Sequence, residues 1–107
     1  MNAVVLGSGG WGTALAIALC DNGHSVTLWS HDLEKARILQ STRENPLLKG
    51  VEIPREIDIS NDISRLEEAE LAVFATPSFA LRETAKKAAP YLPSDALAGS
   101  VTKGIDP

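Results

Sequence analysis

The sequence predicts an α/β fold, a doubly wound parallel sheet of five strands in the order 3-2-1-4-5. Apolar runs of strand length alternate with stretches of helical period along the 107 residues. A glycine-rich turn at residues 7–12 follows the first apolar run. Helical crossovers between successive strands are right-handed and build a sheet of this kind.

The first strand and the first helix open the chain. Residues 3–6 are wholly apolar, which is typical of a central parallel strand covered on both faces. A helix is expected from about Trp11 to Asn22, and Asn22-Gly23 supplies its C-terminal stop. Small residues recur in this helix at Ala14 and Ala18, so we expect it to lie close against the sheet.

The second strand and the second helix follow. Ser25–Trp29 is β-branched and aromatic, as strands are, and Trp29 is interpreted as a core residue. Asp32 is expected to be the N-cap of a helix from Leu33 to about Thr42. Asn45-Pro46 ends this helix, and the segment up to Pro54 is expected to be a loop.

Two more strands and a short helix are expected next. Residues 57–59 form a short third strand, and Asn61 or Asp62 caps a brief helix that ends at about Glu68. Residues 71–75 are uninterrupted and apolar, and they form the fourth strand.

A last helix and a fifth strand complete the pattern. Pro77 closes the fourth strand and Ser78 caps the helix. Its apolar stripe, expected to face the sheet, is Leu81, Ala85, Ala88 and Ala89. Pro90 and Pro93 end the helix, and residues 96–101 are the fifth strand.

Composition limits the classes of function. Cys20 is the only cysteine, so no disulfide or structural zinc site is expected, and we expect it to serve packing. The net charge of −4 argues against nucleic acid or an anionic membrane as a partner. No apolar run approaches the roughly 18 residues of a membrane span. We therefore expect a cytoplasmic domain without bound metal.

The glycine turn matches the dinucleotide pattern G-x-G-x-x-G. Gly7 permits the tight turn, Gly9 lets a diphosphate approach the backbone, and Gly12 lets the helix pack close to the strand. Unpaired N–H groups at the helix start would face the anion. Trp11 has two possible roles, packing of the helix and a contact with the cofactor, and the sequence does not decide between them. These features predict a Rossmann-like fold, and the alternative is a glycine turn in an α/β protein that binds no nucleotide.

The end of the second strand carries Ser30, His31 and Asp32, where a dinucleotide site meets the adenosine ribose. We favour Asp32 as a helix cap over Asp32 as a ribose ligand. Without a fixed carboxylate there, NADP is expected to be accepted as well as NAD. His31 could stack on the adenine or donate to a 2′-phosphate, and an exposed loop histidine is the alternative.

The stretch Gly7-Ser8-Gly9-Gly10-Trp11-Gly12-Thr13-Ala14-Leu15 resembles the opening of the NAD(P)-dependent glycerol-3-phosphate dehydrogenases. Three later segments agree in type and order: Val26–Asp32, Ala75–Ser78 and Val101–Ile105. Residues 45–54 depart from the family, which more often has Tyr-Leu-Pro there.

The resemblance implies cofactor-binding residues along the whole turn and at two further positions: Gly7, Ser8, Gly9, Gly10, Trp11, Gly12, His31 and Lys103. Lys103 would lie beside the nicotinamide and also hold the substrate. Its place just after the fifth strand agrees with this role, because ligands of open α/β sheets lie beyond the carboxyl ends of the strands. A solvated surface lysine is the alternative.

The reaction that the resemblance implies is reversible hydride transfer between NAD(P)H and dihydroxyacetone phosphate, which gives sn-glycerol 3-phosphate for phospholipid synthesis. The family's catalytic lysine lies in a helical C-terminal domain. We expect residues 1–107 to be the dinucleotide-binding domain alone, inactive by itself, and we expect the full-length protein to be a homodimer. The alternatives are a cofactor domain of another two-domain dehydrogenase, acting on a 2-hydroxy acid or sugar acid, and a nucleotide-sensing module.

Overall fold

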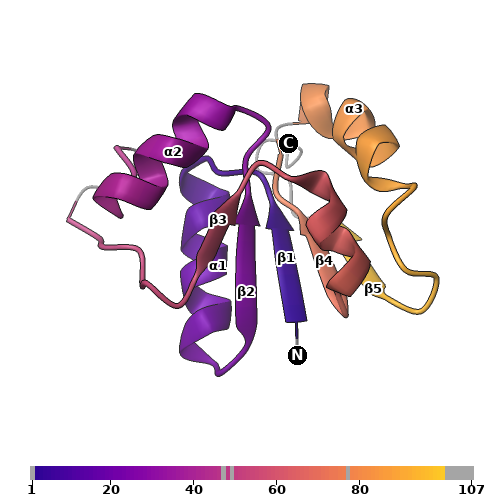
Figure 1. The fold of residues 1–107 in the computed structure, drawn as a ribbon, viewed down its shortest axis with the longest axis horizontal. Coiled ribbons are helices and arrows are strands. Elements are labelled where there is room, and N and C mark those ends of the chain that lie inside the picture. The colour runs from indigo at the N-terminus through magenta and orange to yellow at the C-terminus, as the bar shows by residue number, and fades with distance from the viewer. Residues whose placement is uncertain (1, 47, 49, 77, 101–107) are drawn as a thin grey trace.

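A computed structural model describes residues 2–46, 48, 50–76 and 78–100 of the chain (Figure 1). Strands and helices alternate in the expected order: β1 (Asn2–Leu6), α1 (Gly10–Asp21), β2 (Ser25–Trp29), α2 (Leu33–Thr42), β3 (Asp58–Ser60), the 3-10 helix η1 (Ile63–Glu68), β4 (Leu71–Phe74), α3 (Ser78–Ala88) and β5 (Leu97–Ser100). None of the described helices is long and apolar enough to cross a membrane.

The five strands form one sheet in the order β3-β2-β1-β4-β5, and their pairings are parallel. The predicted fold class and strand order are confirmed. Leu6 at the end of β1 pairs with Trp29 on β2 and with Phe74 on β4. The carboxyl ends of these three strands therefore stand level, and the glycine turn leaves the sheet at this edge.

Helices cover both faces of the sheet, as a doubly wound fold requires. Ala16 of α1 and Leu39 of α2 pack with Val5 and Leu28 on one face. In Figure 1, α1 lies behind the sheet and η1 lies in front of it.

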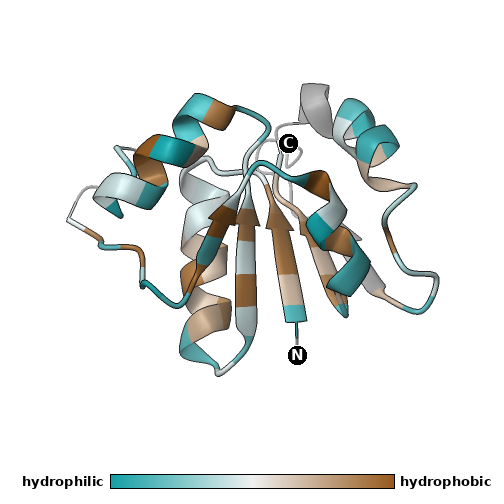
Figure 2. Cartoon of the chain, viewed as in Figure 1, coloured by the Kyte–Doolittle hydropathy of each residue, from teal (hydrophilic) through white to brown (hydrophobic). Residues whose placement is uncertain are grey.

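The front core joins Leu66 of η1 and Ala88 of α3 with Leu6 and Trp29. Trp29 is buried, as predicted. Figure 2 shows hydrophobic residues along the strands and hydrophilic ones over much of α2 and η1. Because alternate residues of a strand face opposite sides of the sheet, the central strand β1 contributes side chains to two separate cores, one on each face.

The helix α1 lies close against the sheet as expected, but Ala14 and Ala18 are not the residues that bring it there. Ala18 is exposed and Ala14 is only partly buried, while the buried residues are Gly12, Thr13 and Ala16. The reason is the tight contact of Gly12 with the glycine turn, described below, which sets the rotation of the helix. Positions four apart share a helix face, so Ala16 faces the sheet on the same side of the helix as Gly12.

The expected stripe on α3 was also wrong in part. Ala88 is buried, but Ala85 and Ala89 are exposed, and Thr84 is buried in their place. The helix packs beside η1, and Ala88 joins Leu66 of η1 in one core. Thr84 lies four residues before Ala88 and so shares its helix face. The side chain of Leu81 lies outside the described part of the chain.

Boundaries differ from the expected ones by a residue or so. The third strand is Asp58–Ser60 instead of residues 57–59, and β4 ends at Phe74 instead of Ala75. The expected end of the fifth strand at Val101, like Pro77, lies outside the described residues.

Candidate anion-binding site

The glycine turn begins with a backbone conformation that a side chain would not tolerate. Gly7 has φ of +129°, and a Cβ placed on it would lie 2.6 Å from the carbonyl oxygen of Ala75. Its N–H donates to the Trp29 carbonyl over 2.9 Å, which continues the β1–β2 ladder. The turn is therefore pressed between the ends of β2 and β4, which confirms the predicted structural role of Gly7.

The first turn of α1 is packed just as tightly. A Cβ on Gly12 would come within 1.9 Å of the Gly7 carbonyl oxygen and 3.3 Å of the Ala75 side chain. Contacts under 3.0 Å require the backbone to move. The predicted role of Gly12, close packing of helix against strand, is confirmed.

Gly9 differs from both neighbours because the space around it is open. A Cβ on Gly9 would meet nothing within 4 Å, and its φ of −69° and ψ of −177° suit any residue. Neither folding sterics nor backbone conformation demands glycine here. A bare Cα at this position instead leaves room for a ligand atom to approach the main chain.

The same residue is the N-cap of α1, and no side-chain hydrogen bond caps this helix. The first intrahelical bond runs from the Thr13 N–H to the Gly9 carbonyl over 3.0 Å, so the N–H groups of residues 10–12 precede it. The first turn carries no acidic residue. These donors and the positive end of the helix dipole favour an anion at this point.

Two other helices of the described chain fill their N-termini with their own carboxylates. Asp32 accepts from the N–H groups of Glu34 (3.0 Å) and Lys35 (3.2 Å) at α2. Asp62 accepts from the Ser64 N–H over 3.0 Å at η1. The Ser64 hydroxyl and N–H hold the pKa of the Asp62 carboxyl below its usual value. Among the three helices whose N-caps the structure describes, α1, α2 and η1, only α1 has no side-chain acceptor for its first N–H groups.

Asn45 lies beneath the turn, a place that no pattern in the sequence predicted. Its Nδ2 donates to the Ser8 carbonyl (3.0 Å) and to Thr13 Oγ1 (2.8 Å), and Asn45 is only 2% exposed. From the sequence, Asn45 was expected only to end the helix before it. An asparagine after a helix is ordinary, and no spacing rule shows that the loop brings it under a turn 37 residues earlier in the chain.

The turn after β2 is fixed by backbone and side-chain bonds. The Ser30 N–H donates to the Ser60 carbonyl (2.9 Å), and Asn61 Nδ2 donates to the Ser30 carbonyl (2.7 Å). Asp32 serves as the α2 cap, as predicted. His31 is exposed between these anchored residues. The imidazole is therefore accessible at the edge of the sheet where the glycine turn also lies.

Of the other predicted site residues, Ser8 is buried, and Trp11 is 45% exposed at the start of α1. An exposed indole beside the turn is free to meet a ligand, and helix packing accounts for only part of its surface. Lys103 lies outside the described residues.

Cys20 packs partly buried against the core, and burial raises the pKa of its thiol, with Glu56 and Asp21 adding to the rise. The thiol is therefore protonated at neutral pH and is a poor nucleophile, in line with the packing role predicted for it.

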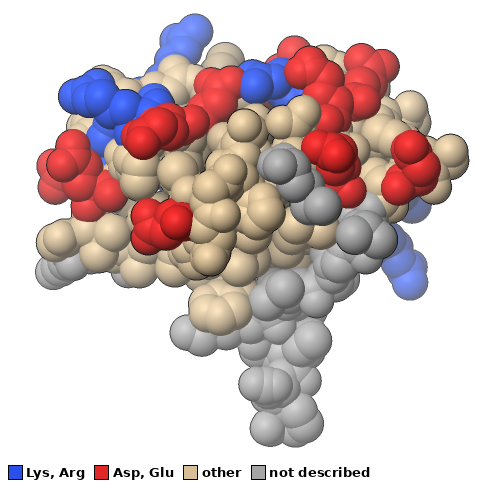
Figure 3. Space-filling view, turned by 90° about the horizontal axis from the view of Figure 1, so that it is seen from below, with Lys and Arg blue, Asp and Glu red and all other residues tan. Residues whose placement is uncertain are grey.

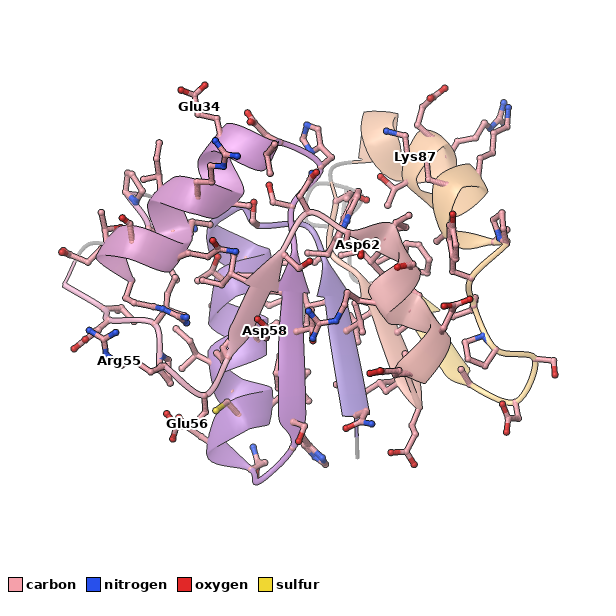
Figure 4. The ribbon with its side chains drawn as sticks, in the orientation of Figure 1. Glu34, Arg55, Glu56, Asp58, Asp62 and Lys87 are labelled. Atoms are coloured by element: carbon pink, nitrogen blue, oxygen red, sulfur yellow. The ribbon has the colours of Figure 1, made fainter. Side chains whose placement is uncertain are left out.

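A hollow of about 180 Å³ lies at the opposite end of the strands, lined by residues that include Asn2, Ser25 and Glu56. Arg65 crosses it, pairing with Asp58 and donating to Thr27 Oγ1 over 3.3 Å. Glu56 and Asp58 lie at this side of β3, away from Asp62 (Figure 4). The hollow is therefore remote from the glycine turn.

Charge is mixed over the surface seen in Figure 3. Lys and Arg side chains stand among Asp and Glu side chains on that face instead of forming one continuous patch. This face lies at the amino ends of the strands, opposite the glycine turn.

Comparison with known proteins gives a family match along the chain. Residues 2–107 match the family model described as NAD-dependent glycerol-3-phosphate dehydrogenase N-terminus. The chain is 42% identical over 105 residues to a glycerol-3-phosphate dehydrogenase [NAD(P)+] of Bacillus velezensis, covering 96% of this chain and 30% of that protein. It is 44% identical over 108 residues to the enzyme of that name from Chlorobium luteolum, covering 99% of this chain and 32% of that protein.

A solved structure agrees with this match. The crystal structure of glycerol-3-phosphate dehydrogenase from Coxiella burnetii superposes with a TM-score of 0.89 at 30% identity, over 96% of this chain and 32% of that one. The chain thus spans about a third of the length of the relatives that it matches.

Proposed function

Because this chain belongs to the NAD-dependent glycerol-3-phosphate dehydrogenase family, we propose that it is the part of such an enzyme that binds the dinucleotide. The observation that carries the proposal is the uncapped start of α1 at Gly9, where a Cβ would meet nothing within 4 Å. The family resemblance predicted from the glycine turn is confirmed by the match over residues 2–107.

The residues of the turn suit the diphosphate of NAD or NADP. The open approach at Gly9 admits the anion, and the N–H groups of Gly10, Trp11 and Gly12 supply donors. Gly7 and Ser8 shape the turn from beneath, since Gly7 needs its positive φ and Ser8 is buried. His31 is proposed to meet the adenosine end, because it is exposed at the turn after β2.

The nicotinamide, when bound, supplies or takes up the hydride of the reaction. Lys103 is proposed to hold the phosphate or the carbonyl oxygen of the substrate beside it. This proposal is supported by the resemblance of residues 101–105 to the family and by the position of β5 in the sheet, at whose carboxyl edge ligands of such folds bind. An ammonium group opposes negative charge at either oxygen.

The activity of the whole protein is part of the proposal. It would interconvert dihydroxyacetone phosphate and sn-glycerol 3-phosphate, with residues 1–107 as the dinucleotide-binding domain and a helical domain carrying the catalytic lysine. A homodimer and a cytoplasmic location belong to the same proposal, the latter supported by a composition with one cysteine.

Calorimetric titration of this chain with NADH and with NADPH tests the binding proposal. We expect saturable heat at one site with at least one of the two, and ADP-ribose should compete for it because it carries the same diphosphate. No saturable heat with either cofactor would refute the proposal. Reduction of dihydroxyacetone phosphate by the 107-residue chain alone would refute the assignment of catalysis to residues outside it.

A further inference from the structure

A buried polar cluster lies under the glycine turn and includes the Asn45 amide, the Thr13 hydroxyl and the Ser8 carbonyl. Asn45 Nδ2 is 3.0 Å from the Ser8 oxygen and 2.8 Å from Thr13 Oγ1, and Thr13 Oγ1 is 3.4 Å from the Ser8 oxygen. All three residues are buried. A buried carbonyl without a donor costs free energy, so the donors of Asn45 and Thr13 hold the Ser8 oxygen facing inward.

The position of Asn45 is set by the loop that carries it, independently of the turn. The backbone of Arg43 takes φ of 56° at the end of α2, and its carbonyl accepts from the Ile53 N–H over 2.7 Å. Arg43 Nη1 donates to the carbonyls of Pro54 (3.1 Å) and Ile57 (2.6 Å). These bonds connect the loop to itself and to the residues before β3. The loop therefore holds the backbone of Asn45 in place.

The orientation of the Ser8 carbonyl decides where the next N–H points. None of the described peptide bonds is cis, and in a planar trans peptide the C=O and the N–H point in opposite directions. With the Ser8 oxygen held inward by Asn45, the Gly9 N–H is directed away from Asn45. Glycine restricts its backbone very little, so the Ser8–Gly9 peptide would be freer to rotate without this hold.

We propose that Asn45 is a positioning residue that holds the Ser8–Gly9 peptide with its N–H presented to the diphosphate of the cofactor. The inference rests on the proposed function of the turn and adds a residue from outside the motif. Preorganised donors strengthen anion binding because no free energy is spent on orienting them when the ligand arrives. A misoriented peptide would instead present its carbonyl oxygen, which repels phosphate.

Two substitutions separate positioning from packing. Asn45→Asp keeps the shape of the side chain but replaces the donating NH₂ by an oxygen, and Asn45→Ala removes the group.

A matched control is Asn22→Ala, because Asn22 Nδ2 makes a bond of the same type to the Ala18 carbonyl (2.8 Å) at the far end of α1, exposed to solvent. Loss of one hydrogen bond to a charged ligand predicts binding of ADP-ribose weaker by about 10- to 100-fold in both Asn45 variants. Asn22→Ala should bind within about twofold of the wild type.

The pH dependence of the affinity for ADP-ribose distinguishes positioning from a purely structural role, because a purely structural role would not make this affinity depend on pH. Burial raises the pKa of a carboxyl group, so the carboxyl introduced by Asn45→Asp should gain a proton under mildly acidic conditions and donate to the Ser8 oxygen. Its affinity for ADP-ribose should therefore recover as the pH falls from about 8 to about 5, relative to wild type, whereas Asn45→Ala should show no recovery. Circular dichroism at each pH checks folding, and where Asn45→Ala fails to fold, the recovery of Asn45→Asp carries the test.

The failure of this inference and the failure of the proposed function give different results. If the wild-type chain does not bind ADP-ribose, the proposed function is refuted and the inference falls with it. If the wild type binds and the folded Asn45 variants bind equally well, the inference alone is overturned. An affinity of Asn45→Asp that is low and stays low at every pH would also overturn it, because the lost donor would then not be the cause.

Discussion

Gly9→Ala should separate ligand binding from folding. The substituted methyl group meets nothing within 4 Å, and φ of −69° with ψ of −177° is allowed for alanine. Replacing glycine at an allowed conformation stabilises a fold by about 0.4–1 kcal/mol, while alanine is a poorer N-cap than glycine by a similar amount. These effects offset each other, so the free energy of unfolding should change by less than about 1 kcal/mol.

Binding should respond very differently to the same methyl group. It would occupy the open approach to the main chain at the start of α1, so at least one N–H bond to the diphosphate would be lost. A hydrogen bond to a charged group contributes about 1.5–3 kcal/mol, which predicts affinity for NADH about 10- to 100-fold weaker. Calorimetry measures the affinity, and urea denaturation measures the unfolding free energy.

Two further glycines provide the comparison. Gly23 has φ of +88° with open space around it, so Gly23→Ala should destabilise the fold by about 1 kcal/mol and leave affinity unchanged. Gly12→Ala forces a Cβ to 1.9 Å from the Gly7 oxygen, so it should impair both folding and binding. Gly9→Ala binding NADH as tightly as the wild type would refute the placement of the diphosphate at this turn.

Three other predictions concern single side chains. In the whole protein, Lys103→Ala should lower the turnover of dihydroxyacetone phosphate by about 100-fold. The control Lys87→Ala, on the exposed surface of α3, should leave this turnover unchanged. A kinetic assay in which Lys103→Ala turns over as fast as the wild type would refute the role of Lys103. Because the folded pKa of Asp62 lies below its usual value of 3.8, its ionised form stabilises the fold above that pH, and this is lost as the pH falls through the folded pKa. Asp62→Ala should therefore unfold at lower urea concentration than wild type at pH 7, with the gap closing in acid; a gap that persists in strong acid would contradict this. Because its thiol pKa is raised, Cys20 should react with iodoacetamide at pH 8 more slowly in the native chain than in urea. Equal rates would contradict the raised pKa.

The sequence predicted the parts of the fold that depend on local pattern. Apolar runs predicted the strands, Asp32 predicted the start of α2, and the glycine pattern predicted the turn between β1 and α1. Each of these signals lies within a few residues of the element that it specifies. The strand order followed from the doubly wound pattern of strands joined by right-handed helical crossovers.

Features that depend on distant packing could not be predicted in this way. The rotation of α1 is set by the Gly12 contact with Gly7, and the rotation of α3 by its packing beside η1, so the expected faces through Ala18 and Ala85 were wrong. The place of Asn45 under the turn depends on the fold of a whole loop. Periodicity indicates that a helix has an apolar side, but its partner decides which residues are buried.

Binding of the diphosphate at the glycine turn is tested most directly by mapping the ligand onto the backbone. A titration of the ¹⁵N-labelled chain with ADP-ribose, followed by two-dimensional NMR, reports each amide separately. We expect saturating shifts that are largest at the N–H groups of residues 9–12, with smaller ones near His31. Shifts centred instead on the hollow around Thr27 and Arg65, or no saturating shifts, would contradict it.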